Sequence, residues 1–162
     1  MLLNIVFFLS VLVLILLLIF CFYQEKFIFR NGHRLRKNFP FHFSTPFDEV
    51  FLTTIDQQEI NAVHLRLPAP KGMVLFFHGN KGNLTKWGER VNYFLEYNYE
   101  VFVLDYRSYG KSTGDFKEDQ MYEDALLAYA HLKKSFSEDQ IVVYGFSLGG
   151  TFASKVAALN RP

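Results

Sequence analysis

The chain opens on an uninterrupted apolar pattern. From Leu2 to Tyr23 it has no charged residue, and only Asn4 and Ser10 are clearly polar. A helix of this length is enough to cross about 30 Å of hydrocarbon. The pattern therefore predicts one transmembrane anchor over residues 1–23. A cleaved signal peptide is the alternative, but the long apolar run, the lack of an early Lys or Arg and the missing small-residue cleavage site argue against it.

A basic and aromatic segment follows and predicts a juxtamembrane connector over residues 24–46. Basic residues lie just after the apolar run, whereas only the amino terminus precedes it; they are Lys26, Arg30, Arg34, Arg36 and Lys37. The positive-inside rule then predicts that the bulk of the chain faces the cytoplasm. The cluster itself fits either contact with lipid head groups or a solvated linker.

Beyond the connector the pattern first becomes alternating. Residues 48–54 and 59–67 each mix apolar and polar positions, and the polar segment "IDQQ" separates them. Two such runs around a polar turn are typical of a β-hairpin with one wet face.

Three short apolar runs then alternate with helical patterns. The runs occupy residues 73–77, 101–104 and 141–144, and each is followed by a glycine-containing loop and an amphipathic or small-residue helix. Strands that are apolar on both faces and alternate with helices predict βαβ units with a mostly parallel sheet. We therefore expect an α/β domain over residues 47–162, with its chemistry in the loops at the carboxyl ends of the strands.

The overall composition narrows the function by exclusion. With 17 basic and 16 acidic residues the charges nearly cancel, and no basic stripe interleaves with aromatic residues. These features give no reason to expect a nucleic-acid partner. The single Cys21 cannot form an intrachain disulfide, and no His, Cys or Asp cluster has metal-ligand spacing. We expect neither a metal nor a cofactor.

The loop after the third apolar run carries the candidate nucleophile. Residues 145–149, Gly-Phe-Ser-Leu-Gly, match the G-x-S-x-G pattern of a nucleophile elbow. A serine on such a strand-to-helix turn is lifted clear of the backbone, and Gly145 and Gly149 keep side chains from colliding. The helix that follows places its partial positive charge near a developing anion. Ser147 is thus the candidate catalytic residue.

The loop after the first run, "FFHGNKGN" at 76–83, is suited to an oxyanion hole. Such a hole needs main-chain N–H groups aimed at the developing negative oxygen, and a His-Gly turn lets the main chain approach closely. We assign the two donors to the amides of Asn80 and Leu148. His78, next to Gly79, could be read as a general base, but anchoring the loop by hydrogen bonds is the favoured interpretation.

The loop after the second run, "LDYRSYGKSTG" at 104–114, looks at first like the end of a phosphate-binding loop. That motif requires glycine where this chain has Asp105, and a buried carboxylate would oppose a phosphate. The favoured interpretation is structural. Asp105 and Arg107 pin the loop beside the elbow, and Gly110 and Gly114 permit its turns.

Together the three loops resemble the α/β-hydrolase superfamily, and most closely its membrane-anchored, serine-aminopeptidase-like (S33-like) serine hydrolases. The "FHGNKGN", "DYRSYGKSTG" and "GFSLG" segments carry the resemblance, which covers about residues 47–160. It implies an α/β-hydrolase fold and hydrolysis of esters, thioesters or amides, with a small-molecule or lipid-like acyl substrate. Ser147 matches the family's nucleophile, and Asn80 and Leu148 match its oxyanion donors.

The sequence departs from the family in two ways. Ser108 stands where the family has glycine, which would strain the loop if that position needs a positive φ. The family's catalytic Asp or Glu and then His follow the serine, whereas no His follows Ser147 here. The chain therefore looks like the amino-terminal half of such an enzyme, inactive by itself, with its last strand left as an exposed apolar edge. A non-catalytic binding or scaffolding protein on the same partial fold is the alternative.

Overall fold

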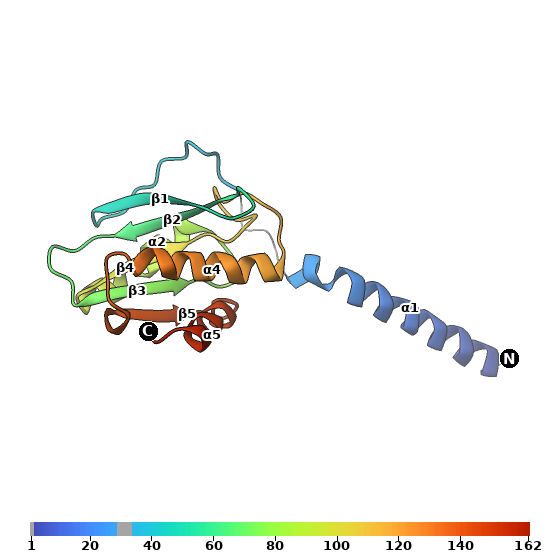
Figure 1. Ribbon diagram of the computed structural model, residues 1–162. Helices are drawn as coiled ribbons and strands as arrows, with labels where there is room; N and C mark the ends of the chain where they lie inside the picture. Colours follow the sequence, from blue (N-terminus) through green and yellow to red (C-terminus); the bar gives the residue numbers. More distant parts are fainter. Residues whose placement is uncertain (1, 29–33) are drawn as a thin grey trace. The chain divides into compact units, whose positions relative to one another are not determined.

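The computed structural model describes residues 2–28 and 34–162, which fall into two compact units, residues 1–30 and 31–162. Figure 1 follows the chain through them. Each unit is described by itself below. Arg30 and His33 lie outside the described residues.

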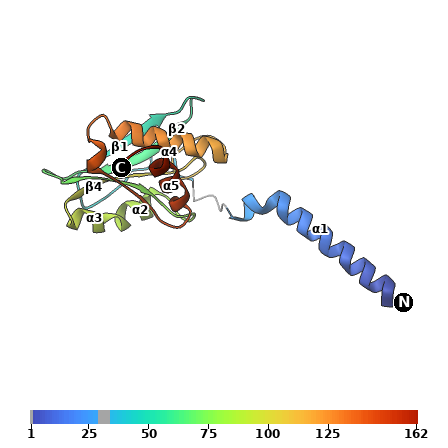
Figure 2. The same cartoon turned by 60° about the horizontal axis from the view of Figure 1, so that its bottom comes forward.

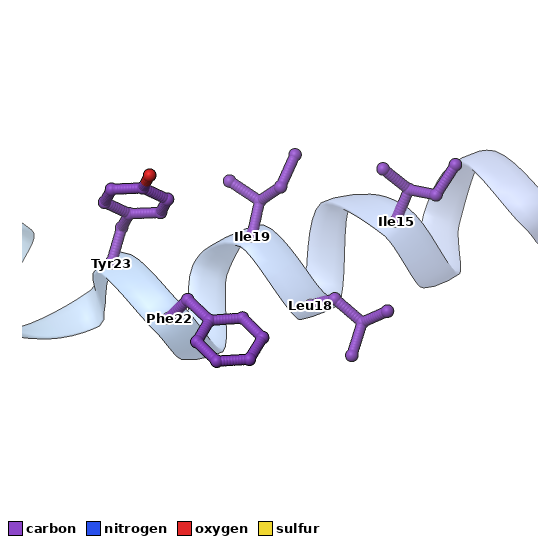
Figure 3. Close-up of a pocket in the computed structure, with 5 residues that line it drawn as sticks. All are labelled: Ile15, Leu18, Ile19, Phe22 and Tyr23. Atoms are coloured by element: carbon purple, nitrogen blue, oxygen red, sulfur yellow. The ribbon is translucent and has the colours of Figure 1, made fainter.

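The first unit is helix α1, Leu2–Ile28. Among the described residues it is the one helix long and apolar enough to cross a membrane, over Leu3–Tyr23. Side chains are exposed all round this stretch. Figure 3 shows Ile15, Ile19 and Tyr23 on one side of the helix, with Leu18 and Phe22 on the other. The hollow between them is lined by this single helix, so it is a helix surface suited to an apolar medium rather than an enclosed site.

The second unit is built on a five-stranded mixed sheet with strand order β1-β2-β4-β3-β5. The expected hairpin is present and pairs antiparallel, and it extends a parallel group of three strands. The strands are β1 Phe47–Thr53, β2 Glu59–Leu65, β3 Gly72–Phe77, β4 Tyr99–Leu104 and β5 Ile141–Gly145. Strand β3 lies between two parallel neighbours and is buried along its whole length, which explains its unbroken apolar sequence.

Helices cover both faces of the sheet (Figure 2). Helices α4, Glu118–Leu132, and α5, Gly149–Leu159, pack on one face through side chains such as Tyr129 and Phe152. Helices α2, Leu84–Arg90, and α3, Asn92–Glu96, pack on the other face through Leu84 and Trp87. The sheet is therefore the middle layer between two apolar cores, the arrangement of an α/β fold.

The helical spacing of Trp87, Val91, Phe94 and Leu95 predicts one apolar helix face after the first parallel strand, and the structure divides this stretch into two short helices. Val91 separates them, with φ of −79° and ψ of −3°, and it is the C-cap of α2 and the N-cap of α3. Trp87 and Val91 are still buried together against the sheet, with Phe94 and Leu95 packed beside them. The apolar face is thus kept although the helix axis breaks.

The segment from Arg34 to Pro46, assigned to a connector from the sequence, packs on the globular unit. Arg34 forms a parallel bridge with Gly110, and the Leu35 N–H donates to the Gly110 carbonyl at 2.9 Å. Phe41 is buried in the core of the α2 face. Phe43 fills the space where a Cβ on Gly88 would lie. These contacts make the segment part of the folded domain.

Candidate active site

The sheet register brings the three loops of interest to one level. Phe77 is paired with Leu104 on one side and with Gly145 on the other. The residues that follow these three strands therefore lie at the same end of the sheet, the carboxyl end. They are His78, Asp105 and Phe146. Carboxyl ends of parallel strands are where α/β folds place their chemistry.

Ser147 lies at the tip of the β5–α5 turn in a strained conformation. Its φ is +52°, in the left-handed region that non-glycine residues rarely occupy, and its side chain is exposed. The glycines around it are required by packing. A Cβ on Gly145 would lie 2.3 Å from the Gly149 carbonyl oxygen, and one on Gly149 would lie 1.9 Å from the Phe77 oxygen. The turn has the geometry of a nucleophile elbow.

The elbow lies directly against the loop after β3. The Phe146 N–H donates to the Phe77 carbonyl at 2.9 Å, and the Phe146 ring would lie 3.0 Å from a Cβ on Gly79. Within the part of the chain that the structure describes, the Leu148 N–H has no hydrogen-bond acceptor. An N–H at the start of α5 with no partner is available to an anion at the surface.

The His78 side chain is buried in the loop, and its two ring nitrogens face the Gly79 carbonyl and Asp105 rather than the surface. Its Nδ1 lies 2.7 Å from the Gly79 carbonyl oxygen, and because that oxygen can only accept, Nδ1 carries the proton. Its Nε2 lies 3.2 Å from Asp105 Oδ1. This is ion-pair distance without hydrogen-bond alignment, since neither atom has a hydrogen-bond partner among the described residues. Both side chains are fully buried.

Asp105 is fully buried, and this burial shifts the pKa of its carboxyl group. Burial raises the pKa of Asp105, and the adjacent His78 opposes that rise. Its Oδ2 accepts the Leu84 N–H at 3.2 Å, at the start of α2. Gly110, with φ of +47°, is needed here because a Cβ would collide with that same oxygen. Asp105 therefore joins β4, α2 and the Gly110 turn.

Arg107 uses all five of its N–H donors. It binds Asp56 in the β1–β2 turn and Asp124 on α4 through two contacts each, at 2.6–2.9 Å, and it also donates to Gln120. Its side chain is 2 % exposed. The sequence predicts that Arg107 pins this loop, and the contacts show the elements it joins.

Two tyrosines of the same loop received no role from the sequence. Tyr106 donates its hydroxyl hydrogen to the His78 carbonyl at 2.6 Å. The single hydroxyl hydrogen of Tyr109 is shared between the Asn80 carbonyl at 3.0 Å and Asn80 Oδ1 at 2.8 Å. Both side chains are buried. Their position in "DYRSYG", directly after a strand of the site, was the available signal.

No described histidine is hydrogen-bonded to Ser147. His64 pairs with Glu100 on neighbouring strands, His131 lies on α4 against Phe102, and His42 is exposed in the segment before β1. In the same described part of the chain, no group of three or more His, Cys, Asp or Glu side chains could hold a metal ion. The site as described is an exposed serine next to the Leu148 N–H, on a turn that contacts the loop after β3.

These features belong to a known class. Residues 68–162 match the family described as "Serine aminopeptidase, S33". The chain belongs to this family of the α/β-hydrolase superfamily, and its fold is a partial α/β-hydrolase domain.

Relatives and solved structures extend the likeness. Protein bem46 of Schizosaccharomyces pombe is 31 % identical over 142 residues, which are 82 % of this chain and 46 % of that protein. An uncharacterized membrane protein of Saccharomyces cerevisiae is 29 % identical over 86 % of this chain and 51 % of that protein. The esterase Pf2001 of Pyrococcus furiosus superposes with a TM-score of 0.60 and 26 % identity, over 76 % of this chain and 48 % of that structure. The chain thus spans about half the length of these relatives.

Proposed function

We propose that Ser147 is the nucleophile of a membrane-anchored serine hydrolase that cleaves esters, thioesters or amides. The observation that carries this proposal is the exposed Ser147 at φ +52°, on a strand-to-helix turn that contacts the loop after β3. The Leu148 N–H, which has no acceptor among the described residues, supports it. The family match and the esterase likeness favour acyl transfer as the reaction class.

The proposed reaction uses these groups together with a general base. Ser147 Oγ attacks the acyl carbon and gives its proton to a general base, while the carbonyl π electrons move to oxygen. The amides of Asn80 and Leu148 stabilise that oxyanion. The intermediate collapses to an acyl-serine as the alcohol, thiol or amine leaves with the proton, and water then releases the acid.

None of the histidines that the structure describes is hydrogen-bonded to Ser147 as a general base. His78 has both ring nitrogens directed to Gly79 and Asp105. The relatives are about twice as long as this chain. In the proposal, the general base comes from polypeptide that corresponds to their additional length. Ser147 in this chain alone should then react slowly, because a triad serine without its base retains only residual catalysis.

Helix α1 is proposed to anchor the enzyme in a membrane, with the hydrolase domain on the cytoplasmic side. The exposed apolar surface of α1 and the basic residues after it support this arrangement. A lipid-like acyl substrate would fit such an anchor. Reporter fusions at both ends test the orientation, and an extracytoplasmic carboxy terminus would contradict it.

A fluorophosphonate probe tests the nucleophile in the full-length protein that carries this chain. We expect labelling of the native protein, no labelling of Ser147→Ala, and unchanged labelling of Ser154→Ala, a matched exposed serine on α5. Hydrolysis of p-nitrophenyl esters should fall by up to about 10⁶-fold in Ser147→Ala. Labelling that survives Ser147→Ala would assign the reactive group to another residue, and absence of labelling in the native protein would favour the scaffolding alternative.

A further inference from the structure

In the loop after β3, three consecutive main-chain carbonyls each accept a hydrogen bond from a buried ring side chain. The His78 carbonyl accepts from Tyr106 Oη at 2.6 Å, and the Gly79 carbonyl accepts from His78 Nδ1 at 2.7 Å. The Asn80 carbonyl accepts from Tyr109 Oη at 3.0 Å, and the same hydroxyl is 2.8 Å from Asn80 Oδ1. We call Tyr106, His78 and Tyr109 the carbonyl clamp.

The carbonyl clamp fixes the direction of the Asn80 N–H through the geometry of the peptide group. The Gly79 carbonyl and the Asn80 N–H belong to one planar trans peptide and point in opposite directions. Fixing that carbonyl on His78 therefore fixes the direction of the N–H. Tyr109 fixes the next peptide through the Asn80 carbonyl, so the planes on both sides of the Asn80 Cα are held.

The rings of the clamp have little freedom to move. His78 stacks on Trp87 with ring centroids 5.7 Å apart and lies 4.4 Å from Tyr106. Tyr109 is fully buried, 5.7 Å from His78 and 5.8 Å from Tyr106. The clamp is thus a packed unit, and a preorganised donor needs such support to stabilise charge without reorganising.

We propose that Tyr109 is a positioning residue that, with Tyr106 and His78, aims the Asn80 N–H at the oxyanion. This inference rests on the proposed function, and it gives the two tyrosines a part in the same site. Tyr109 acts through Asn80 and does not touch the substrate. Burial, with a smaller contribution from Asp105, raises the pKa of Tyr109 to about 12. The hydroxyl therefore stays a donor across neutral pH.

The test compares Tyr109→Phe with the native full-length protein, using a p-nitrophenyl ester and an alkyl trifluoromethyl ketone that forms a tetrahedral adduct on serine. We expect kcat to fall by about 10- to 100-fold, less than or comparable to loss of an oxyanion donor, with KM changed by less than about twofold. Affinity for the ketone should fall by the same factor as kcat. The shape of the pH profile should stay unchanged.

Tyr93→Phe is the matched control, because it also removes one tyrosine hydroxyl bond, the 3.1 Å contact of exposed Tyr93 on α3 with exposed Tyr97 just after that helix. It should leave kcat, KM and ketone affinity as in the native protein. If Tyr109→Phe melts below the assay temperature, Tyr106→Phe carries the test, with the same pattern of lowered kcat and ketone affinity.

The outcomes separate this inference from the proposed function. Activity that persists in Ser147→Ala defeats the proposed function and this inference with it. If Ser147→Ala abolishes activity while Tyr109→Phe lowers only the melting temperature, or raises KM with kcat unchanged, the positioning role alone is overturned. Equal losses in Tyr93→Phe and Tyr109→Phe overturn it as well.

Discussion

The two edges of the sheet differ in how they meet water. Strand β1 forms one edge and exposes Asp48 and Glu49. Strand β5 forms the other edge, pairs with β3 alone among the described strands, and leaves Val142 and Tyr144 more than 40 % exposed. Phe146, just beyond β5, is 49 % exposed. One edge carries charges that discourage pairing with another chain, and the other carries none.

The difference extends to what holds each edge. The β1–β2 turn is tied through exposed Asp56 to buried Arg107 and from there to α4, so ion pairs of Arg107 cross-link the polar side of the sheet. The β5 side, which carries Ser147, lies beside an apolar hollow of about 330 Å³ lined partly by Val142 and Tyr97. Ser147, the candidate nucleophile, thus lies on the side of the sheet where more apolar surface is exposed.

The largest expected effect comes from cutting the link on the polar side. Arg107→Met keeps an unbranched apolar stem but removes the guanidinium and leaves buried Asp124 without its cation. Breaking a buried ion pair from one side destabilises by about 3–5 kcal/mol, so we expect loss of that order in the free energy of unfolding. Urea unfolding of the detergent-solubilised protein measures it. A loss below about 1 kcal/mol would mean that the ion pairs of Arg107 are not the main stabilising contacts on the β1–β2 side of the sheet.

The second prediction places a charge on the apolar edge. Val142→Lys should reduce aggregation of this chain, because a lysine on an edge strand opposes pairing with another copy. The free energy of unfolding should change by less than about 1 kcal/mol, since the position is partly exposed. Size-exclusion chromatography and light scattering across a concentration series measure the effect.

The mirror variant is Asp48→Val on the charged edge, where Asp48 pairs with Arg66 at 2.7 Å in an exposed position. It should increase aggregation. If both variants leave the concentration dependence unchanged, the contrast between the edges has no consequence for association.

Much of this architecture is predictable from local sequence patterns, and the reasons are physical. The apolar runs ending at Phe77, Leu104 and Tyr144 predict three parallel strands because only buried strands are apolar on both faces. The glycines flanking Ser147 predict the elbow, and the structure shows the main-chain contacts that exclude a Cβ there. Ser108, at a family glycine position, indeed adopts a positive φ of 67°.

What sequence reasoning missed depends on contacts between distant segments. Tyr106 and Tyr109 read as ordinary core residues, since nothing local shows that their hydroxyls meet carbonyls 28 and 29 positions earlier. Phe41 and Phe43 likewise lie in a stretch without periodicity, and their burial follows from the fit against α2 and the sheet. Tertiary packing of this kind carries no local signature.

The third prediction uses pH to loosen the polar side. The hydrogen bond from Arg107, then the one from Thr54, holds the pKa of Asp56 below its usual range. A lowered folded-state pKa gives stability that is present above the unfolded pKa, about 3.9, and is lost as pH falls through the folded value. Asp56→Asn should therefore flatten the fall in stability below about pH 4.

Urea midpoints at a series of pH values measure this effect. Asp115→Asn is the control, because Asp115 is exposed and makes no ion pair among the described side chains. It should keep the native pH dependence. An unchanged acid dependence in Asp56→Asn would assign the acid sensitivity to other groups.

The smallest expected effect is at Ser108, where strain and bonding oppose each other. Ser108→Gly relieves a left-handed conformation worth about 1–2 kcal/mol. It also removes the hydroxyl bond to the Gly114 carbonyl, 2.9 Å long, worth about 1 kcal/mol, and adds about 0.5–1 kcal/mol of chain entropy to the unfolded state. The net change in the free energy of unfolding should lie within about 1 kcal/mol of zero. A gain above 2 kcal/mol in urea unfolding would show that the hydroxyl bonds do not support the loop, and would leave Arg107 as its main restraint.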